Sequence, residues 1–337
     1  MQILTNISLL PYNTFGIDVD ANYFAEYQNI AELCELLQSD ILKSKKMLHI
    51  GGGSNLLFLS DFQGIILHSN IKFIDKTDET ENEIFLKVGS GILWDDFVNY
   101  CVANNYYGAE NLSLVPGEVG AAAVQNIGAY GAEISNIVEM VETIDVQTFE
   151  KKIFSKNECL YDYRKSVFKT DLKGKKIVTA VHFKLSKMPN FNLGYAHLEQ
   201  HILKKYAEIN LTTIRDTVIS IRTSKLPDPK AVGNAGSFFT NPYICTAHCE
   251  GLKKHFPDIT YYIVNEDVVK VSAAWLIEQC GWKGKSLGHA AVNEKQPLVL
   301  VNQGNATGAE ILALATKIQQ SVKKKFCIDL QMEVEVI

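Results

Sequence analysis

The 337-residue sequence lacks the features that mark membrane, secreted and nucleic-acid-binding proteins. It has no run of about 18 uncharged apolar residues, so we expect no membrane span. Residues 1–11 lack a basic segment followed by an apolar run and a small-residue cleavage site, which argues against secretion and favours the cytoplasm. The formal net charge is only −5 and the lysines are dispersed apart from short runs, so no basic stripe predicts nucleic acid as a partner.

A disulfide framework and a metal centre are not indicated either. The seven cysteines are an odd number scattered from Cys34 to Cys327, a usage typical of reduced thiols. The one local cluster lacks the paired CxxC spacing of zinc knuckles, and we expect it to pack on a helix face and to hold no metal. Its members are Cys245, His248, Cys249 and His255.

Three widespread functional signatures are also missing. The sequence contains no G-x-G-x-x-G of a Rossmann fold, no GK[ST] of a P-loop and no G-x-S-x-G nucleophile elbow. A dinucleotide-binding Rossmann domain and a hydrolase serine nucleophile are therefore disfavoured.

What is present is a chain long enough for two or three domains, in which apolar periodicities of 3.6 and 2 alternate. This alternation predicts a mixed α and β architecture. The predicted helices are Ile30–Gln38, Leu93–Asn104, Leu211–Arg222, Ser272–Cys280 and Ala309–Lys324. The predicted strands are Met47–Ile50, Gly64–His68, Ile84–Val88, Glu139–Val146, Ile177–Leu185 and Pro297–Val301, with antiparallel pairing expected between Glu139–Val146 and Ile177–Leu185.

The main domain boundary is expected at Leu226-Pro227-Asp228-Pro229, because neither proline can continue a helix. Residues 1–222 then form a first module and residues 223–330 a second. The alternation of residues 331–337 predicts a final strand, with Glu333 on the face opposite Met332 and Val334.

Two glycine-rich segments are candidate anion sites. Gly51-Gly52-Gly53-Ser54-Asn55 follows a predicted strand, and Val115–Gly120 leads through an alanine-rich turn into Gln125–Gly131. Backbone N–H groups that converge in such segments bind phosphate, and two of them suit the diphosphate of a dinucleotide. The side-chain amides of Gln125 and Asn126 can hydrogen-bond the edge of a flavin ring. Taken alone, the first segment can also be a tight turn between two strands, and the second a glycine-rich crossover within a sheet.

Three further positions carry side chains suited to catalysis. Arg164, after Tyr163, can stabilise a carboxylate or a developing enolate by forked donation. Ser237 lies in the predicted loop Gly233–Pro242, between small residues and two phenylalanines that would form a dry wall. Glu333 is the third. In isolation, Arg164 and Glu333 can also be solvent-exposed surface charges, and the serine loop can have a purely structural role.

Read together, these segments resemble the UDP-N-acetylenolpyruvoylglucosamine reductase family, the MurB family. The motifs occur in family order and span almost the whole chain. They are Asn13-Thr14-Phe15-Gly16, Gly52–Asn55, Pro116–Gly131, Tyr163-Arg164, Lys225–Pro229 and Gly233–Phe239. The stretch that contains Tyr195 resembles the longer subtype, which keeps a tyrosine loop over the substrate.

The resemblance implies an α+β fold: a two-subdomain FAD-binding module of the vanillyl-alcohol-oxidase (PCMH) type over residues 1–222, a smaller α+β substrate-binding domain over 223–330, and a last strand over 331–337 that returns to the first module. It implies a monomer. Catalytic residues would be Arg164, Ser237 and Glu333. The cofactor residues would be Gly51, Gly52, Gly53, Ser54, Asn55, Pro116, Gly117, Gly120, Gln125, Asn126, Gly128 and Tyr130. The substrate residues would be Tyr163, Tyr195, Lys225, Asn241 and Gln296.

The implied reaction is the NADPH-dependent reduction of UDP-N-acetylglucosamine enolpyruvate to UDP-N-acetylmuramate through FAD, a step of peptidoglycan precursor biosynthesis. Ser237 would protonate an enolate that Arg164 and Glu333 stabilise. The chain departs from the family at its end, where the usual Glu-Pro-Glu-Val-Arg is replaced by Gln331-Met332-Glu333-Val334-Glu335, so a cofactor contact at Glu335 is not carried over.

Two rival functions are compatible with parts of this pattern. An oxygen-using alcohol oxidase on the same flavin fold would consume oxygen without NADPH. A non-catalytic nucleotide-sugar-binding protein would use both glycine segments for the ligand's diphosphate and would be colourless when purified. Neither accounts for Arg164, Ser237 and Glu333 in the expected order.

Overall fold

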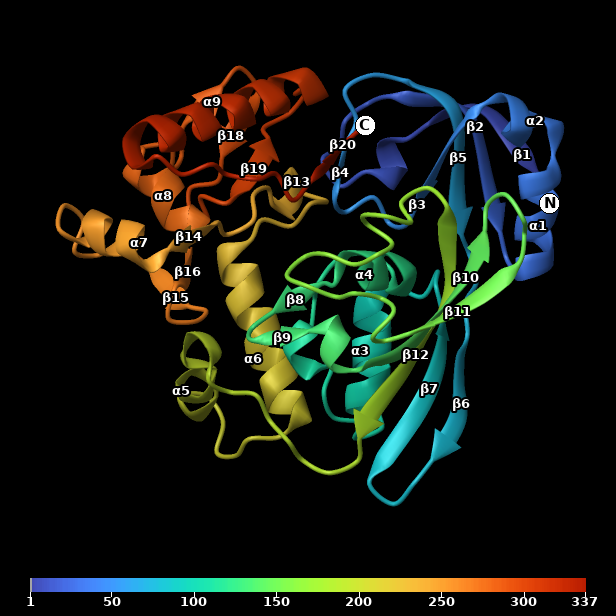
Figure 1. The fold of residues 1–337 in the computed structure, drawn as a ribbon, viewed down its shortest axis with the longest axis horizontal. Coiled ribbons are helices and arrows are strands. Elements are labelled where there is room, and N and C mark those ends of the chain that lie inside the picture. Colours follow the sequence, from blue (N-terminus) through green and yellow to red (C-terminus); the bar gives the residue numbers. More distant parts are fainter. Residues whose placement is uncertain (1) are drawn as a thin grey trace. The chain divides into compact units, whose positions relative to one another are not determined.

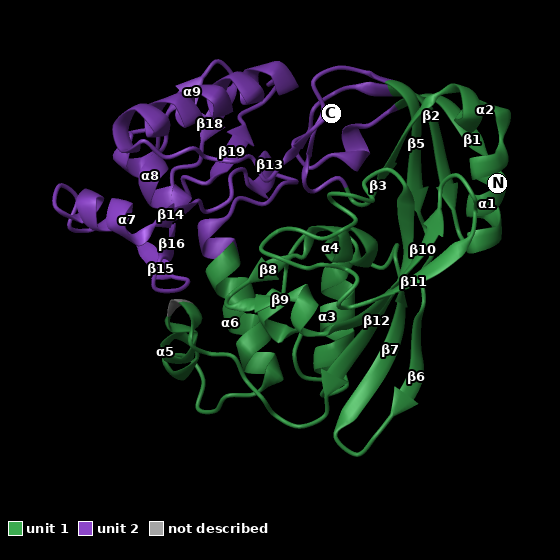
Figure 2. Cartoon of the chain, viewed as in Figure 1, with its two compact units in different colours: residues 1–7, 21–52, 63–222 green, residues 8–20, 53–62, 223–337 purple. Residues whose placement is uncertain are grey.

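The computed structural model describes residues 2–337 and is drawn in Figure 1. The chain divides into two compact units, coloured separately in Figure 2, and the division falls between Arg222 and Thr223. Unit 1 contains residues 2–7, Ala21–Gly52 and Gln63–Arg222, and unit 2 contains Ser8–Asp20, Gly53–Phe62 and Thr223–Ile337. The segments 8–20 and 53–62 thus cluster with the C-terminal unit, whereas the sequence had grouped them with the first module.

One sheet of unit 1 has the strand order β1-β2-β5-β3. Its strands are β1 (Ile3–Ser8), β2 (Asp20–Tyr27), β5 (Phe62–Ser69) and β3 (Lys46–Ile50), and β3 and β5 run parallel. Helix α1 (Ile30–Gln38) begins at Asn29, whose side chain accepts the Glu32 N–H as an N-cap. The apolar face of α1 packs with Ile65 and Leu67 in one buried cluster. Helix α2 (Asp40–Ser44) follows it.

The second sheet of unit 1 has the order β11-β10-β12-β7-β6. Its strands are β6 (Ile74–Glu79), β7 (Glu83–Gly89), β10 (Val138–Asp145), β11 (Lys151–Ser155) and β12 (Lys176–Ser186). β10 and β12 are antiparallel, with Val141 opposite Val181, which confirms the predicted pairing. Helix α3 (Trp94–Ala103) packs Phe97 against Phe183 of β12, with ring centroids 4.5 Å apart. Burial of such side chains contributes about 2 kcal/mol each.

The remaining elements of unit 1 are short, except for helix α6. They are α4 (Val119–Gln125), β8 (Gly128–Ala129), β9 (Ala132–Glu133), α5 (Leu198–Leu203), the 3₁₀ turns Glu110–Leu112, Ile134–Asn136 and Tyr195–His197, and α6 (Leu211–Lys225), which ends three residues beyond Arg222.

Unit 2 contains a sheet of order β13-β19-β18-β17 and a three-stranded sheet of order β14-β16-β15. Its longest helix, α9 (Gly308–Phe326), begins with a capping box between Thr307 and Glu310 and ends at Cys327 in the left-handed conformation. The other elements are the 3₁₀ turn Leu10–Tyr12, β4 (Leu56–Leu57), β13 (Gly233–Ser237), β14 (Tyr243–Cys245), α7 (Thr246–Lys253), β15 (Tyr261–Ile263), β16 (Val268–Val271), α8 (Ala273–Gln279), β17 (Ser286–Leu287), β18 (Ala290–Val292), β19 (Val299–Asn302) and β20 (Glu335–Val336).

The mixed α+β fold class is confirmed, but three local predictions were wrong. The predicted loop Gly233–Pro242 begins as strand β13, because its backbone pairs antiparallel with β19 despite its glycines. The predicted alanine-rich turn is helix α4, since alanine favours helix where the flanking glycines permit its entry and exit. Between β11 and β12, Tyr163-Arg164 lie in a tight turn, with Arg164 at φ +56. The predicted strand over 331–337 is limited to β20, which pairs parallel with β4, plus one bridge from Met332 to Phe239.

Candidate functional site

The two glycine segments approach each other closely in unit 1. A Cβ atom at Gly51 would lie 3.1 Å from the Cβ of Ala121, and one at Gly52 would lie 3.7 Å from the Cα of Gly117. A Cβ at Gly120 would lie 2.7 Å from the Cβ of Ser90, too close for any larger residue. The backbones of the two segments therefore approach each other closely, as a phosphate cradle requires, and the Glu118 side chain lies against Gly51 and Gly52.

Unit 2 fixes the second half of the first glycine segment. Gly53 has φ +64, and a Cβ there would lie 1.9 Å from the carbonyl oxygen of Tyr12. The N–H of Thr14 donates to the Gly53 carbonyl at 3.2 Å. Asn13, which is 5% exposed, holds its own loop through hydrogen bonds to Leu9 O, Ile17 O and Ile17 N–H. The Asn13-Thr14-Phe15-Gly16 motif is thus a rigid support for Gly53.

Arg164 is clamped against the second glycine segment. Its guanidinium donates to the carbonyl oxygens of Gly128 and Asn126, and it lies 3.8 Å from the Glu133 carboxylate. It also lies over the Tyr163 ring, 5.1 Å from the ring centroid. The positive φ of Arg164 and these contacts fix a half-buried positive charge beside Gly128.

Asn126 has a structural role that the sequence did not reveal. Its side chain is buried, its Nδ2 donates to Glu133 Oε2 and to the Asp162 carbonyl, and its Oδ1 accepts the Ser135 N–H. All of these hydrogen bonds are made within the protein. We therefore infer that the Asn126 side chain shapes the loop and does not form the predicted hydrogen bond to the edge of a flavin ring. Gln125, the last residue of α4, is half-buried.

Tyrosines gather beside this loop. The rings of Tyr130 and Tyr195 are 6.2 Å apart in an edge-on arrangement, and Tyr195 is 40% exposed. The Tyr130 carbonyl and the Asn192 carbonyl both accept from Asn111 Nδ2, which ties the 190s segment to the second glycine segment. Tyr195, predicted as a substrate contact, therefore lies next to Tyr130, predicted as a cofactor contact.

Unit 2 brings Ser237 and Glu333 together although they are far apart in sequence. The Glu333 N–H donates to the carbonyl of Phe238, the residue after Ser237, at 2.8 Å. Asn55 Nδ2 donates to the Glu333 carbonyl at 3.0 Å, so the first glycine segment meets the same place. Ser237 is exposed, whereas Phe238 and Phe239 are 0% and 1% exposed. The exposed Ser237 is thus followed in the chain by two fully buried phenylalanines.

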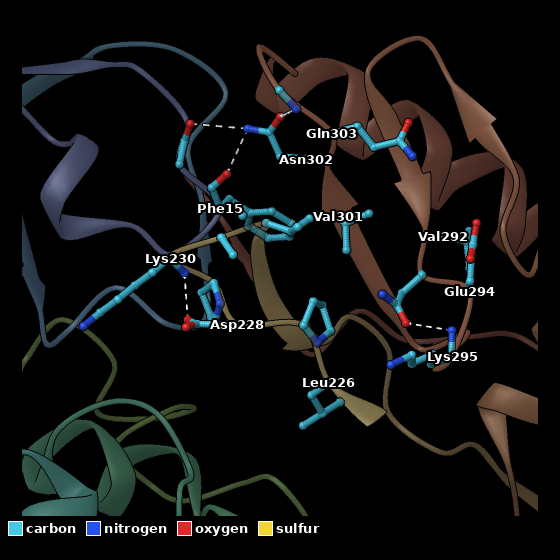
Figure 3. Close-up of a pocket in the computed structure, with 18 of the residues that line it drawn as sticks. Phe15, Leu226, Asp228, Lys230, Val292, Glu294, Lys295, Val301, Asn302 and Gln303 are labelled. Atoms are coloured by element: carbon cyan, nitrogen blue, oxygen red, sulfur yellow. Dashed lines mark hydrogen bonds between the residues drawn. The ribbon is translucent and has the colours of Figure 1, made fainter. Parts of the chain in front are cut away.

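Lys225 lines a pocket of about 1060 Å³ in unit 2 (Figure 3). Lys230 and Lys295 line the same pocket, as do Asp228 and Glu294. The pocket lining thus carries three lysines and two carboxylates, and the lysines can bind a phosphate-bearing ligand as point charges.

The two other predicted substrate residues of unit 2 do not line that pocket. Asn241 uses its Oδ1 to accept the Ala273 N–H at the start of α8, at 2.9 Å. Gln296 is half-buried in the turn before β19, and its carbonyl accepts the Val299 N–H. Their predicted contacts to the nucleotide sugar stay predictions.

Sequence reasoning missed several buried side-chain groups that have no hydrogen-bond partner within residues 2–337, among them Thr14 and Arg222. The hydroxyl of Thr14, beside Gly53, and the Nε of Arg222, near the end of α6, are buried and form no hydrogen bond within residues 2–337. Burial lowers the pKa of Arg222, while Tyr130 and Asp95 raise it. Thr14 lies in the Asn13-Thr14-Phe15-Gly16 motif, but no motif indicates that its hydroxyl or the Arg222 Nε lacks a partner, because only long-range packing reveals this.

The described residues form neither a metal-binding cluster nor a membrane-spanning helix. Among residues 2–337, no group of three or more His, Cys, Asp and Glu side chains is placed to hold a metal ion. Within the same residues, no helix combines the length and apolarity needed to cross a bilayer. In the 245–255 cluster, Cys249 is buried in α7 and His248 Nε2 bonds to the Phe326 carbonyl, so these residues pack as expected.

These observations fit FAD. The paired glycine cradle of unit 1 would accept the diphosphate, because Gly51, Gly52, Gly117 and Gly120 let the backbone approach a ligand closely.

Comparison with known proteins agrees with this fit. A family described as "FAD binding domain" matches residues 21–150, and "UDP-N-acetylenolpyruvoylglucosamine reductase, C-terminal domain" matches residues 228–337. The UDP-N-acetylenolpyruvoylglucosamine reductase of Bacteroides fragilis is 49% identical over 98% of both chains, and that of Porphyromonas gingivalis is 45% identical over 100% of both. The crystal structure of the Thermus caldophilus enzyme, at 22% identity, superimposes with a TM-score of 0.70 over 100% of this chain and 99% of that one, which shows the shared fold. Full-length identity at this level establishes that the chain belongs to the UDP-N-acetylenolpyruvoylglucosamine reductase family.

Proposed function

We propose that this chain reduces UDP-N-acetylglucosamine enolpyruvate to UDP-N-acetylmuramate with NADPH, and so supplies peptidoglycan precursors in the cytoplasm. The observation that supports the assignment of roles is the backbone hydrogen bond from Glu333 N–H to the carbonyl of Phe238, because it pairs the segment of Glu333 with the residue that follows Ser237. Family membership gives the reaction, an FAD-dependent reduction of the enolpyruvyl C=C bond.

Bound FAD would supply the hydride to the terminal enolpyruvyl carbon, after taking it from NADPH. Ser54 and Asn55 would hold it with the glycine cradle, and Pro116, Gln125, Gly128 and Tyr130 would line it. Since the NADPH and the enol ether would use one cleft in turn, no separate Rossmann motif is needed for NADPH.

Arg164 would bind the enolpyruvyl carboxylate and stabilise the negative charge that develops when hydride arrives. The carbonyl oxygens of Asn126 and Gly128 hold the guanidinium, so its orientation is set before substrate binds. A preorganised donor costs no reorganisation during the reaction, and one such donor contributes roughly 10² to 10³ in rate.

Ser237 would then donate its proton to the neighbouring enolate carbon, with Glu333 as hydrogen-bond partner of the same intermediate. A serine hydroxyl is a weak acid in water, so this transfer depends on exclusion of solvent. The buried rings of Phe238 and Phe239, which follow Ser237 directly after the end of β13, would help to exclude solvent.

The nucleotide sugar would be held by Tyr163, Tyr195, Lys225, Asn241 and Gln296. Lys225 suits the diphosphate as a point charge, and Lys230 and Lys295 on the same pocket would reinforce it. The exposed Tyr195 ring is accessible to stack on or bond to a substrate.

The proposal is tested by purifying the protein, recording its visible spectrum and following NADPH absorbance with and without UDP-N-acetylglucosamine enolpyruvate. We expect a yellow protein whose NADPH oxidation depends on the enol ether. A colourless protein, or oxygen uptake that needs an alcohol and no NADPH, would overturn the proposal. NADH in place of NADPH is the matched co-substrate control.

A further inference from the structure

A buried carboxylate lies against the glycine cradle, where it opposes a diphosphate. Glu118 belongs to the second glycine segment and its side chain is 7% exposed. A Cβ built on Gly51 would lie 3.2 Å from Glu118 Oε2, and one built on Gly52 would lie 3.9 Å from Oε1. An uncompensated negative charge at this position repels a dianionic ligand, and water screens it little because it is buried.

His68, at the end of β5, contacts this carboxylate directly. Its Nε2 lies 2.8 Å from Glu118 Oε1, and its Nδ1 lies 2.8 Å from Glu26 Oε1 on β2. A carboxylate only accepts hydrogen bonds, so a ring with a carboxylate on each nitrogen must donate from both. This geometry selects the doubly protonated, positively charged imidazolium. Glu26 is 43% exposed, so water screens its charge, and Glu118 is the buried partner.

The other groups that face His68 do not supply a competing positive charge. On β3, burial and the charge of His68 together lower the pKa of His49 to about 3, so His49 is neutral. On β2, burial raises the pKa of Tyr27, whose hydroxyl bonds to His49 Nε2 at 2.7 Å. The ring of Phe24 lies 6.4 Å from that of His68 and carries no charge. Of these groups, only His68 can neutralise Glu118.

We propose that His68 is a positioning residue for the cofactor: its positive charge neutralises Glu118 beneath the Gly51–Gly52 backbone and makes FAD retention depend on pH. The inference deepens the proposed function and rests on FAD binding at this cradle.

The sign of the pH dependence follows from the pairing. Burial lowers the pKa of His68, but the hydrogen bonds and charges of Glu118 and Glu26 outweigh it, so the net pKa is raised. His68 is therefore charged below that raised pKa and becomes neutral as the pH rises through it. Loss of its proton leaves Glu118 uncompensated and weakens FAD binding. By linkage, the diphosphate itself favours the protonated ring, so FAD binding at alkaline pH takes up protons.

The test measures FAD release from the diluted holoenzyme by the fluorescence of free FAD, over a pH series from acid to alkaline, without any activity assay. For the wild type we expect a dissociation constant that rises with pH. His68→Gln should bind FAD roughly 10- to 100-fold more weakly at low pH and lose the pH dependence, as expected for removal of one charge near the diphosphate. Glu118→Gln should bind at least as tightly as the wild type, with a flat profile.

The double variant His68→Gln, Glu118→Gln separates charge from packing. Restoration of near wild-type affinity supports the proposal, because the two charges cancel when both are removed. Affinity as weak as that of His68→Gln alone overturns it, as does a flat wild-type profile. His182→Gln is the matched control, because His182 pairs at 2.9 Å with Glu142 on β10 and not with the cradle, and it should not change FAD release.

Failure of this inference is distinguishable from failure of the proposed function. If the wild-type protein holds no FAD at any pH, the proposed function fails. If it holds FAD tightly with no pH dependence and His68→Gln binds as well as the wild type, only the role of His68 fails. Circular dichroism of each variant establishes that it is folded before the comparison is made.

Discussion

Replacement of Asn13 by alanine tests whether one buried side chain supports the part of unit 2 that carries both Gly53 and Ser237. Asn13 makes three hydrogen bonds, to Leu9 O at 2.8 Å, Ile17 O at 2.9 Å and Ile17 N–H at 2.8 Å. The neighbouring Thr14 bonds on one side to the Gly53 carbonyl and on the other, through its own carbonyl, to the Asn234 N–H of β13.

The expected loss follows from these three bonds. A buried hydrogen bond contributes about 1 kcal/mol, and each backbone group left without a partner adds a further fraction of its desolvation cost, so Asn13→Ala should lower the free energy of unfolding by about 3–5 kcal/mol. That is a large part of the roughly 5–15 kcal/mol typical of folded proteins.

The assay is urea unfolding followed by tryptophan fluorescence, to which Trp275, buried in unit 2 at 9% exposure, contributes with Trp94 and Trp282. Asn13→Asp is an isosteric comparison: it keeps an acceptor for Ile17 N–H but sets a carboxylate oxygen against two carbonyls, so it should destabilise as much as alanine. Asn29→Ala, which removes only the N-cap of α1, should cost about 1 kcal/mol. A loss below about 1 kcal/mol for Asn13→Ala, or a well-tolerated Asn13→Asp, would refute the reasoning.

Three further predictions concern Arg164, Gly53 and the pair of Asp95 with Arg215. Arg164→Ala should slow the half-reaction with the enol ether roughly 10² to 10³-fold while reduction by NADPH is little changed; equal losses in stopped-flow traces would count against its role. Gly53→Ala should abolish FAD retention or folding, because its Cβ would lie 1.9 Å from a carbonyl oxygen; a yellow, folded variant would show that the loop tolerates a side chain. Burial raises the pKa of Asp95, but the hydrogen bonds from Arg215 and the Leu114 N–H outweigh it and the net pKa is lowered. The stability from this bidentate pair is therefore present above the ordinary Asp pKa of about 3.9 and lost as the pH falls through the lowered value. Arg215→Met should cost about 1–2 kcal/mol in urea unfolding at neutral pH and markedly less at pH 3; equal losses at both would contradict the pairing.

Periodicity alone predicted the long regular elements. Helix α1 was predicted with its observed bounds, and α9 to within two residues at each end, because apolar residues at helical spacing mark one buried face. The antiparallel β10–β12 pair was also predicted, since both strands are long and rich in β-branched residues.

Segments whose conformation depends on distant partners were not predicted. Strand β13 is a run of small residues with no strand propensity, and it is extended because β19 pairs with it. Helix α4 lies among glycines that read as turns, and it ends at Asn126 in the left-handed conformation. For β13, tertiary pairing overrides local preference, whereas α4 follows the helix preference of its alanines, which the neighbouring glycines obscured.

The same limit applies to the site. The sequence suggested Ser237 and Glu333 as separate candidates, but only the folded chain shows the Glu333 N–H bonded to the Phe238 carbonyl. In the sequence, His68 is only the last residue of a predicted strand. Its contact with Glu118 depends on packing between β5 and the second glycine segment. Orphaned donors such as Thr14 Oγ1 have no sequence signature at all.

The most direct measurement of the central claim is a single turnover of Ser237→Ala in the stopped-flow spectrometer. The variant should be yellow, should be reduced by NADPH at the wild-type rate, and should be reoxidised by UDP-N-acetylglucosamine enolpyruvate roughly 10² to 10⁴-fold more slowly, because the proton donor is gone. Thr240→Ala, which removes a hydroxyl from the same segment, is the control and should be reoxidised like the wild type. Reoxidation of Ser237→Ala at the wild-type rate would contradict the account.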